Sequence, residues 1–229
     1  MLKIKNVELH GWEPGIRGMR NPKNSWKKSD SEFVTTDGDH HDICGNCGPW
    51  YGSYGWEEAV IGENDLNLMT TLRDAGTDHR KFMRMIVVYM DVTAPLYWWK
   101  EYDTYKVGTV TNSCSTMHKI AEKEFTLDDF SCEHLIGIAK DDLHGTTSVL
   151  NHFRKLYLQS KDKKYWWQMI QLLPSSYNQR RTVMLNYEVL ANIYKSRRNH
   201  KLDEWHTFCD LIESLPYSEL ITGREEKND

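Results

Sequence analysis

The chain of 229 residues has no apolar run near the roughly 18 residues that suggest a membrane-spanning helix, and no signal-peptide pattern at its start. Both absences predict a cytoplasmic protein with no membrane partner. Basic residues are not in excess either, since 29 Lys and Arg stand against 33 Asp and Glu, for a net charge of −4. Without a basic field over the chain, we do not expect a nucleic-acid partner.

Cysteine is scarce, and its odd count does not have the spacing of a small secreted disulfide framework. We therefore expect reduced thiols. The five residues are Cys44, Cys47, Cys114, Cys132 and Cys209.

One pair of cysteines lies close to histidines. Cys44-x-x-Cys47 follows His40 and His41, and all four side chains are of types that zinc accepts. A zinc ribbon needs a second cysteine pair at a suitable distance, and the sequence has none. A glycine-rich surface loop explains the segment more simply, so these four are weak metal candidates. A metal-dependent protein built around these four residues is a weak hypothesis, and two others follow below.

What the chain does have is the composition of a globular protein, with 39% hydrophobic and 27% charged residues. Its 9 Trp and 12 Tyr are expected mostly to fill a core. A few strands alternating with longer helices predict a single α+β domain over residues 1–229. Within it, residues 23–57 are expected to form an irregular insertion rich in glycine and aromatic residues, and 222–229 a frayed tail.

Individual elements follow from periodicity and from helix caps. Alternation predicts a strand over residues 2–9, and β-branched and aromatic residues predict a buried strand over 82–92. Thr126-x-x-Asp129 is the capping box of a short acidic helix. Further helices are expected over residues 16–19, 64–76, 142–157, 165–173, 179–197 and 202–215.

The stretch Thr93–His118 combines an apolar aromatic run with a dense group of charged and hydroxyl side chains between Glu101 and Ser115. A buried element that supports such a group is one way to build a site. An amphipathic core helix followed by a capping loop is the simpler alternative. Cys114, close to Lys106 in sequence, is either an activated thiol or, more simply, an inert buried cysteine.

Two other polar groups stand out. Asp78–Lys81 precedes the expected buried strand, where loops often carry function, although a charged turn also explains it. On the helix expected over residues 179–197, Asn192 and Arg197 lie five residues apart, which separates them by about 140° around the axis. They contact one ligand only if it wraps the helix end or if several subunits meet there.

Several segments together resemble the flavin-dependent thymidylate synthases. Ile16-Arg17-x-x-Arg20 is similar to an early helix with paired arginines, and Asp91–Pro95 to a strand that leads into Ala-Pro. The most specific part extends from Leu173-Pro174 to Trp205, and within it Asn192 and Arg197 match the Asn and Arg of the family. The likeness covers most of the chain in order and at matching spacing.

The resemblance implies a homotetramer whose sites lie between subunits, with FAD as cofactor and with folate and NADPH as further reactants. The implied activity is transfer of a one-carbon unit to C5 of a pyrimidine deoxynucleotide, dUMP. Catalytic Arg197 would polarise the uracil, Asn192 would orient the flavin, and Lys106 with Arg20 would hold phosphate. Further candidates are His79, Arg80 and Tyr105 for the cofactor, and Glu101, Cys114 and Ser115 for the substrate.

The chain departs from the Arg-His-Arg signature of this family. Extension from Ala94-Pro95 places the signature on Thr104-Tyr105-Lys106 and its following serine on Cys114. A shift of one residue matches Asn112 and Ser115 instead.

Both arginines of the signature are missing under either alignment, and none occurs between Arg84 and Arg154. Guanidinium groups bind phosphate through forked, charge-assisted hydrogen bonds, whereas a lysine supplies a single point charge. The alternative is therefore a homologue that has lost flavin chemistry and binds a nucleotide, or has a structural or regulatory role.

Overall fold

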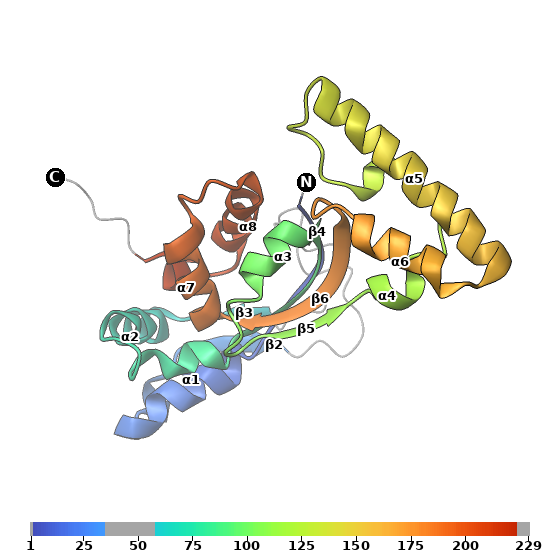
Figure 1. Ribbon diagram of the computed structural model, residues 1–229. Helices are drawn as coiled ribbons and strands as arrows, with labels where there is room; N and C mark the ends of the chain where they lie inside the picture. The colour runs from blue at the N-terminus through green and yellow to red at the C-terminus, as the bar shows by residue number, and fades with distance from the viewer. Residues whose placement is uncertain (1, 35–57, 224–229) are drawn as a thin grey trace. The chain divides into compact units, whose positions relative to one another are not determined.

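The computed structural model describes residues 2–34 and 58–223 (Figure 1). Four strands form one sheet in the order β1-β4-β6-β5, and β2 and β3 form a separate antiparallel pair. The α+β class predicted from the sequence is confirmed. The strands are β1 Lys3–His10, β2 Glu32–Val34, β3 Glu58–Val60, β4 Val87–Pro95, β5 Val110–Ser113 and β6 Asn178–Asn186.

Helices account for most of the remaining described residues. The α-helices are α1 Trp12–Arg20, α2 Glu63–Asp74, α3 Leu96–Tyr102, α4 Thr116–Lys119, α5 Ile138–Ser160, α6 Lys163–Leu172, α7 Tyr187–Arg197, α8 Asp203–Ser214 and α9 Glu219–Thr222. Short 3₁₀ helices are η1 Asn21–Lys23, η2 Trp26–Lys28, η3 Arg80–Arg84 and η4 Leu127–Asp129. Within the described ranges, no helix has the length and apolarity to cross a membrane.

The direction of the central strand pair follows from two hydrogen bonds at its ends. The Tyr187 amide donates to the Ile86 carbonyl, and the Leu96 amide donates to the Tyr177 carbonyl, each at 3.0 Å. Residue numbers therefore rise along β4 while they fall along β6, so the two strands are antiparallel.

The chain forms two compact units that alternate along the sequence. Unit 1 comprises residues 1–3, 92–104 and 112–182, and unit 2 comprises residues 4–91, 105–111 and 183–229. Each strand of the main sheet has residues in both units. The single domain expected over residues 1–229 stays a prediction, and much of the expected insertion and tail lies outside the described residues.

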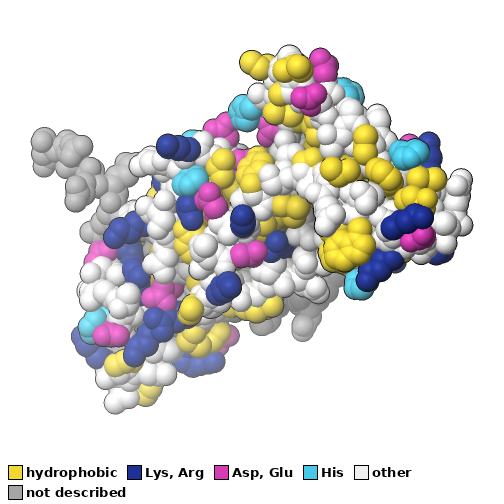
Figure 2. Space-filling model, in the orientation of Figure 1, with side chains coloured by type: hydrophobic (Ala, Val, Ile, Leu, Met, Phe, Trp, Pro, Cys, Tyr) yellow, Lys and Arg dark blue, Asp and Glu magenta, His cyan; other side chains and the backbone are white. Residues whose placement is uncertain are grey.

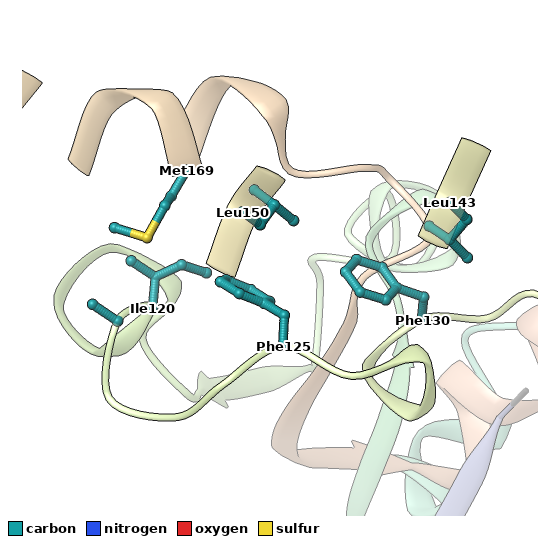
Figure 3. Close-up of a cluster of buried hydrophobic side chains, with 7 residues drawn as sticks. Ile120, Phe125, Phe130, Leu143, Leu150 and Met169 are labelled. Atoms are coloured by element: carbon teal, nitrogen blue, oxygen red, sulfur yellow. The ribbon is translucent and has the colours of Figure 1, made fainter. Parts of the chain in front are cut away.

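Unit 1 has a core between α5, α6 and the segment that precedes α5 (Figure 3). Leu150 and Met169 are fully buried there, packed with Phe125 and Phe130. Asn151 of α5 fixes the preceding segment, because its amide group both donates to the Phe125 carbonyl and accepts from the Phe125 amide at 2.8 Å. The expected capping box at Thr126 and Asp129 is present.

Helix α3 in unit 1 buries aromatic side chains from the apolar run of Thr93–His118. Trp98, Trp99 and Tyr102 contact one another, with ring centroids 4.9–5.3 Å apart. The Trp99 indole N–H donates to the Gln179 carbonyl at 2.9 Å, and the Arg181 guanidinium lies 4.2 Å from the Trp99 ring centroid. The run is thus an aromatic core, as the simpler alternative predicted.

Unit 2 is organised around three aromatic rings. Trp12 of α1 contacts Tyr187 and Tyr217 edge to face, with centroids 5.3 and 5.2 Å away. Both phenols are hydrogen-bonded: Tyr187 donates to the Pro216 carbonyl at 2.6 Å, and the Ile61 amide donates to Tyr217 at 2.8 Å. A tyrosine hydroxyl needs such a hydrogen-bond partner when it is removed from water.

The helix expected over residues 179–197 is wrong in its first half. Residues 178–186 form strand β6, in which buried Gln179, Val183 and Leu185 alternate with more exposed side chains, and only Tyr187–Arg197 is helical. Asn186 separates the two elements, because its side-chain oxygen accepts from the Val189 amide at 3.0 Å and caps the helix. This period-two alternation is typical of a strand and not of the helix predicted there.

Two other boundaries differ from the prediction. The buried strand expected over residues 82–92 is β4, Val87–Pro95, and residues 82–84 belong to the 3₁₀ helix η3. The helix expected at residues 16–19 is α1, which begins at Trp12 and includes Pro14. Proline is tolerated in a first turn because the amides there have no helical partner.

Candidate functional site

Helix α7 in unit 2 carries two of the predicted site residues. Asn186 caps its N-terminus, and Leu190 and Ile193 bury its inner face completely. Asn192 is exposed and Arg197 is partly exposed in the last turn. The buried face fixes the rotation of the helix, so the two polar side chains leave the helix in different directions.

Arg197 is held by aromatic side chains. Its Nε–H donates to the phenol oxygen of Tyr105 at 2.9 Å, and its guanidinium lies 4.9 Å from the Trp205 ring centroid. Tyr105 and Trp205 contact each other edge to face at 6.2 Å. The structure therefore brings together predicted residues Tyr105 and Arg197, which lie 92 positions apart in sequence.

The segment Tyr105–Thr111 lies along α7 and is attached at both ends of the helix. Beyond the Tyr105–Arg197 bond, the Asn186 amide group donates to the Gly108 carbonyl at 3.4 Å. A Cβ at Gly108 would lie 2.9 Å from Asn186 Nδ2 and 3.2 Å from Val189 Cγ2, and φ is +77°. Glycine is therefore required for this close approach.

A second polar group occupies another side of α7. Arg80 donates from Nε to Glu188 at 3.1 Å and from Nη2 to Asn192 at 3.4 Å, and Arg84 also pairs with Glu188. Burial favours a raised pKa for the Glu188 carboxyl, but hydrogen bonds from Arg84 and Arg80 lower that pKa below its ordinary value. Two guanidinium groups share one carboxylate, so the group has a net positive charge.

Arg80 and Asn192 of this group are predicted from the sequence, whereas Glu188 and Arg84 are not. Neither has a local signal, because their partners lie 104 or more positions away in sequence. Helix α7 therefore carries two separate polar groups. One is the Arg197 guanidinium, which lies against aromatic rings. The other is the positively charged cluster around Glu188, which includes the Asn192 amide. Such groups suit a planar carbonyl compound or an anion.

The other predicted residues of unit 2 are placed differently. Arg20 is buried, with 4% of its side chain exposed, and its Nε lies 2.6 Å from Asp65 Oδ1. That ion pair gives the predicted phosphate-binding role of Arg20 no geometric support. His79 precedes η3 and is exposed, as is Lys106 in the segment beside α7.

The remaining candidates belong to unit 1. Cys114 is an exposed free thiol, and its backbone is fixed by Arg180 and Gln179. The Ser115 hydroxyl accepts from the His118 amide at 3.0 Å and caps the short helix α4. Glu101 is partly buried, and its carbonyl accepts from the Thr104 hydroxyl at 2.7 Å. Their predicted roles toward substrate stay predictions.

The weak metal candidates His40, His41, Cys44 and Cys47 lie outside the described residues. In residues 2–34 and 58–223, no group of three or more His, Cys, Asp or Glu side chains is arranged to hold a metal ion.

Several solved structures of known proteins are similar to this chain. No protein-family model and no curated sequence matches the chain. Thymidylate synthase X from Helicobacter pylori, solved with FAD and dUMP, has a TM-score of 0.66 at 13% identity, over 97% of this chain and 98% of that one. A second structure, of the flavin-dependent thymidylate synthase from the same organism with FAD and dUMP, has a TM-score of 0.65 at 14% identity, over 95% and 98%.

A third structure is more distantly similar. A UMP/dUMP methylase from Streptomyces cacaoi, bound with 5-Br UMP, has a TM-score of 0.50 at 14% identity, over 67% of this chain and 76% of that chain. The fold of this protein is thus that of the flavin-dependent thymidylate synthases, as the sequence resemblance predicted. At these identities the likeness shows the fold alone.

Proposed function

We propose, from the fold that the chain shares with flavin-dependent thymidylate synthases, that this protein binds a pyrimidine nucleotide beside α7. The observation that carries the proposal is the Arg197 guanidinium fixed between the Tyr105 phenol and the Trp205 ring. A guanidinium held in this way is oriented before the ligand arrives, which reduces the entropy cost of binding.

Arg197 supplies the charge that recognises the ligand in this proposal. Its N–H groups donate to a carbonyl oxygen of the pyrimidine and draw electron density away from the ring. Lys106, on the same segment as Tyr105, supplies a point charge for the phosphate. Arg20 is not part of the proposed site, because Asp65 already neutralises it in a buried pair. Glu101, Cys114 and Ser115 belong to unit 1, and their roles toward substrate stay predictions.

The residues at the signature positions do not fit the diphosphate of FAD. Thr104, Tyr105 and Lys106 offer one ammonium there, and Arg197, the guanidinium bonded to that segment, is directed onto Tyr105. Diphosphate recognition by this segment would need the forked donors that two arginines provide. We therefore assign no reaction step to a flavin. The predicted cofactor contacts Asn192, His79 and Arg80 stay predictions.

Flavin-dependent one-carbon transfer to C5 of dUMP, with folate and NADPH, is the second candidate function. The five-residue spacing of Asn192 and Arg197 on α7 favours it, because this is the spacing of the resemblance. Homotetramer assembly and a cytoplasmic location belong to the same proposal, and sedimentation of the purified protein tests the tetramer.

The two candidates are separated by an absorption spectrum and a ligand screen on the full-length protein. We expect a colourless preparation that FAD does not stabilise against thermal unfolding. We expect dUMP or UMP to stabilise it, by about 2.7 kcal/mol at 100 times the dissociation constant. A visible flavin spectrum would favour the second candidate, and no response to any nucleotide or flavin would contradict both.

A further inference from the structure

An exposed surface of unit 1 places lysines directly over aromatic rings. We call the group Lys161, Lys163, Lys164, Tyr165 and Trp167 the α6 basic surface. The Lys164 ammonium lies 4.8 Å from the Tyr165 ring centroid, and the Lys163 ammonium lies 5.7 Å from that of Trp167. Figure 2 shows apolar and basic side chains intermixed over the part of the molecule where Figure 1 draws α5 and α6.

The local charge here is opposite to that of the whole chain. Residues 154–164 contain five Lys or Arg and one acid, so their charge is 5 − 1 = +4, whereas the chain has a net charge of −4. The acid, Asp162, accepts from the Lys164 amide at 2.9 Å and pairs with the Lys164 ammonium at 3.1 Å, so this pair adds no net charge and the other lysines give the surface its positive charge. The surface therefore has a basic field that the overall charge conceals.

The apolar face of α6 is already buried within the unit. Met169 is fully buried, and Trp166, Ile170 and Leu173 pack against the core shown in Figure 3. The Trp166 indole N–H donates to the Met117 carbonyl at 3.0 Å and fixes this face. Trp167 is not among the residues that pack against that core, and it is 43% exposed. An amphipathic helix that inserts into a lipid surface needs a free apolar face, which α6 does not offer.

We propose that the α6 basic surface binds single-stranded nucleic acid. Proteins bind single strands without sequence preference by stacking bases on aromatic rings while cations follow the phosphates. The exposed Trp167 supplies the ring, and Lys163 lies next to it. Lys164 lies over Tyr165, whose ring also stacks on Phe153, and Lys161 lies over Tyr157, so these two lysines supply cations only. The proposal does not rest on nucleotide binding at α7, because it uses different residues in a different unit.

The test is the fluorescence anisotropy of a labelled twelve-residue oligothymidylate titrated with the full-length protein at low and at physiological salt. We expect binding that weakens with salt. The triple variant Lys161→Gln, Lys163→Gln, Lys164→Gln should lower the slope of log affinity against log salt by about 2, at roughly 0.7 per phosphate contact. Trp167→Ala should weaken binding about fivefold or more, from the loss of one stacked base.

The chain offers matched controls. Trp26→Ala removes a tryptophan of similar exposure, 48%, from unit 2. The triple variant Lys23→Gln, Lys27→Gln, Lys28→Gln removes the same charge from exposed positions in unit 2. Both should bind the oligonucleotide like the wild-type protein, and circular dichroism verifies that every variant is folded.

Further experiments distinguish which ligand binds to the α6 basic surface. An oligouridylate of the same length tells whether DNA or RNA binds more tightly, and either result supports the proposal. Excess dUMP should leave oligonucleotide binding unchanged. The proposal is overturned if no oligonucleotide binds at low salt, if dUMP displaces it, or if the control variants weaken binding as much. It is also overturned if the α6 variants instead abolish binding to vesicles containing anionic lipid or dissociate an oligomer of the chain.

Discussion

Arg197, the last residue of α7, donates its Nε–H to the phenol oxygen of Tyr105 at 2.9 Å. Extension from Ala94-Pro95 places Tyr105 at the central position of the Arg-His-Arg signature, and this hydrogen bond joins that segment to α7. The guanidinium is also supported by Trp205, 4.9 Å away. The orientation of Arg197 therefore depends on residues from three parts of the sequence.

Tyr105→Phe removes only the hydroxyl group and so tests whether the orientation of Arg197 depends on it. The ring remains while the acceptor for Arg197 is lost, and a hydrogen bond to a charged group contributes about 1.5–3 kcal/mol. We expect dUMP affinity to fall about tenfold or more, measured by calorimetric titration. Tyr89→Phe is the control, because it removes a phenol of 41% exposure elsewhere in unit 2. Equal affinity in both variants would show that the Tyr105 hydroxyl does not orient Arg197 for the ligand.

Gly108→Ala tests the fit of the segment against α7. The added Cβ would lie 2.9 Å from Asn186 Nδ2, in a backbone conformation with φ of +77° that alanine disfavours. We expect a loss of about 1–3 kcal/mol in unfolding free energy, measured by urea denaturation, together with weaker dUMP binding.

Gly145→Ala serves as the matched control for that substitution. Gly145 lies within α5, and a Cβ there meets nothing within 4 Å. Alanine in a helix interior is favoured over glycine, so we expect a gain of about 1 kcal/mol in stability. If both alanine variants stabilise the protein, the close packing at Gly108 is refuted.

Glu188→Gln tests the cationic cluster through its pH dependence. The pKa of Glu188 is lowered in the folded protein, so its stabilisation is complete above the unfolded pKa, near 4.3, and is lost as pH falls through the folded value. We expect the variant to be less stable by about 2 kcal/mol at pH 7, from the loss of two charged hydrogen bonds. This difference should shrink as the pH is lowered below about 4.

Glu122→Gln is the control for Glu188→Gln. The Glu122 carboxylate pairs with Lys119 on the surface, where both side chains are more than half exposed. Such pairs contribute at most about 1 kcal/mol, so chemical denaturation should detect little change at any pH. A pH-independent difference between Glu188→Gln and the wild-type protein would rule out the ionised Glu188 as its cause.

Asp65→Asn tests the structural assignment of Arg20. Asp65 is fully buried and accepts from the hydroxyls of Ser29 at 2.6 Å and Ser31 at 2.7 Å, besides pairing with Arg20. Asparagine leaves the buried guanidinium without its counter-charge, so we expect a loss of about 3–5 kcal/mol in unfolding free energy.

The affinity of the folded Asp65→Asn variant for dUMP should be unchanged, measured at a temperature where it is native. Asp210→Asn is the control, since its carboxylate is 64% exposed and its partner Arg198 is 38% exposed, so this surface pair should matter little. A large loss of nucleotide affinity with little loss of stability would contradict the structural role of Arg20 and support its predicted role in phosphate binding.

The sequence predicted most helices because their signals are local. The capping box at Thr126 and the helices now seen as α5, α6 and α8 depend on residues within one or two turns, which spacing captures. The strand β6 was missed because its alternation is continuous with the helical spacing of α7. Only the cap at Asn186 separates the two patterns.

The candidate site was harder to predict for a different reason. The resemblance selected Asn192, Arg197, Tyr105 and Arg80, and the structure bonds them in two pairs. Glu188, which pairs with Arg80 and Arg84, has no local sequence pattern, since these ion pairs join residues 108 and 104 positions apart. The burial of Arg20 was equally hidden, because an arginine of an early helix looks the same whether it contacts a ligand or Asp65.

The most direct test of nucleotide binding beside α7 is calorimetric titration of dUMP into the wild-type protein and Arg197→Gln. Arg198→Gln is the matched control, because Arg198 is the next residue and pairs with Asp210 at 2.7 Å. We predict saturable binding that Arg197→Gln weakens at least tenfold, equivalent to about 1.4 kcal/mol, and that Arg198→Gln leaves unchanged. Equal affinity of the wild-type protein and Arg197→Gln, or no binding by the wild-type protein, would contradict the account.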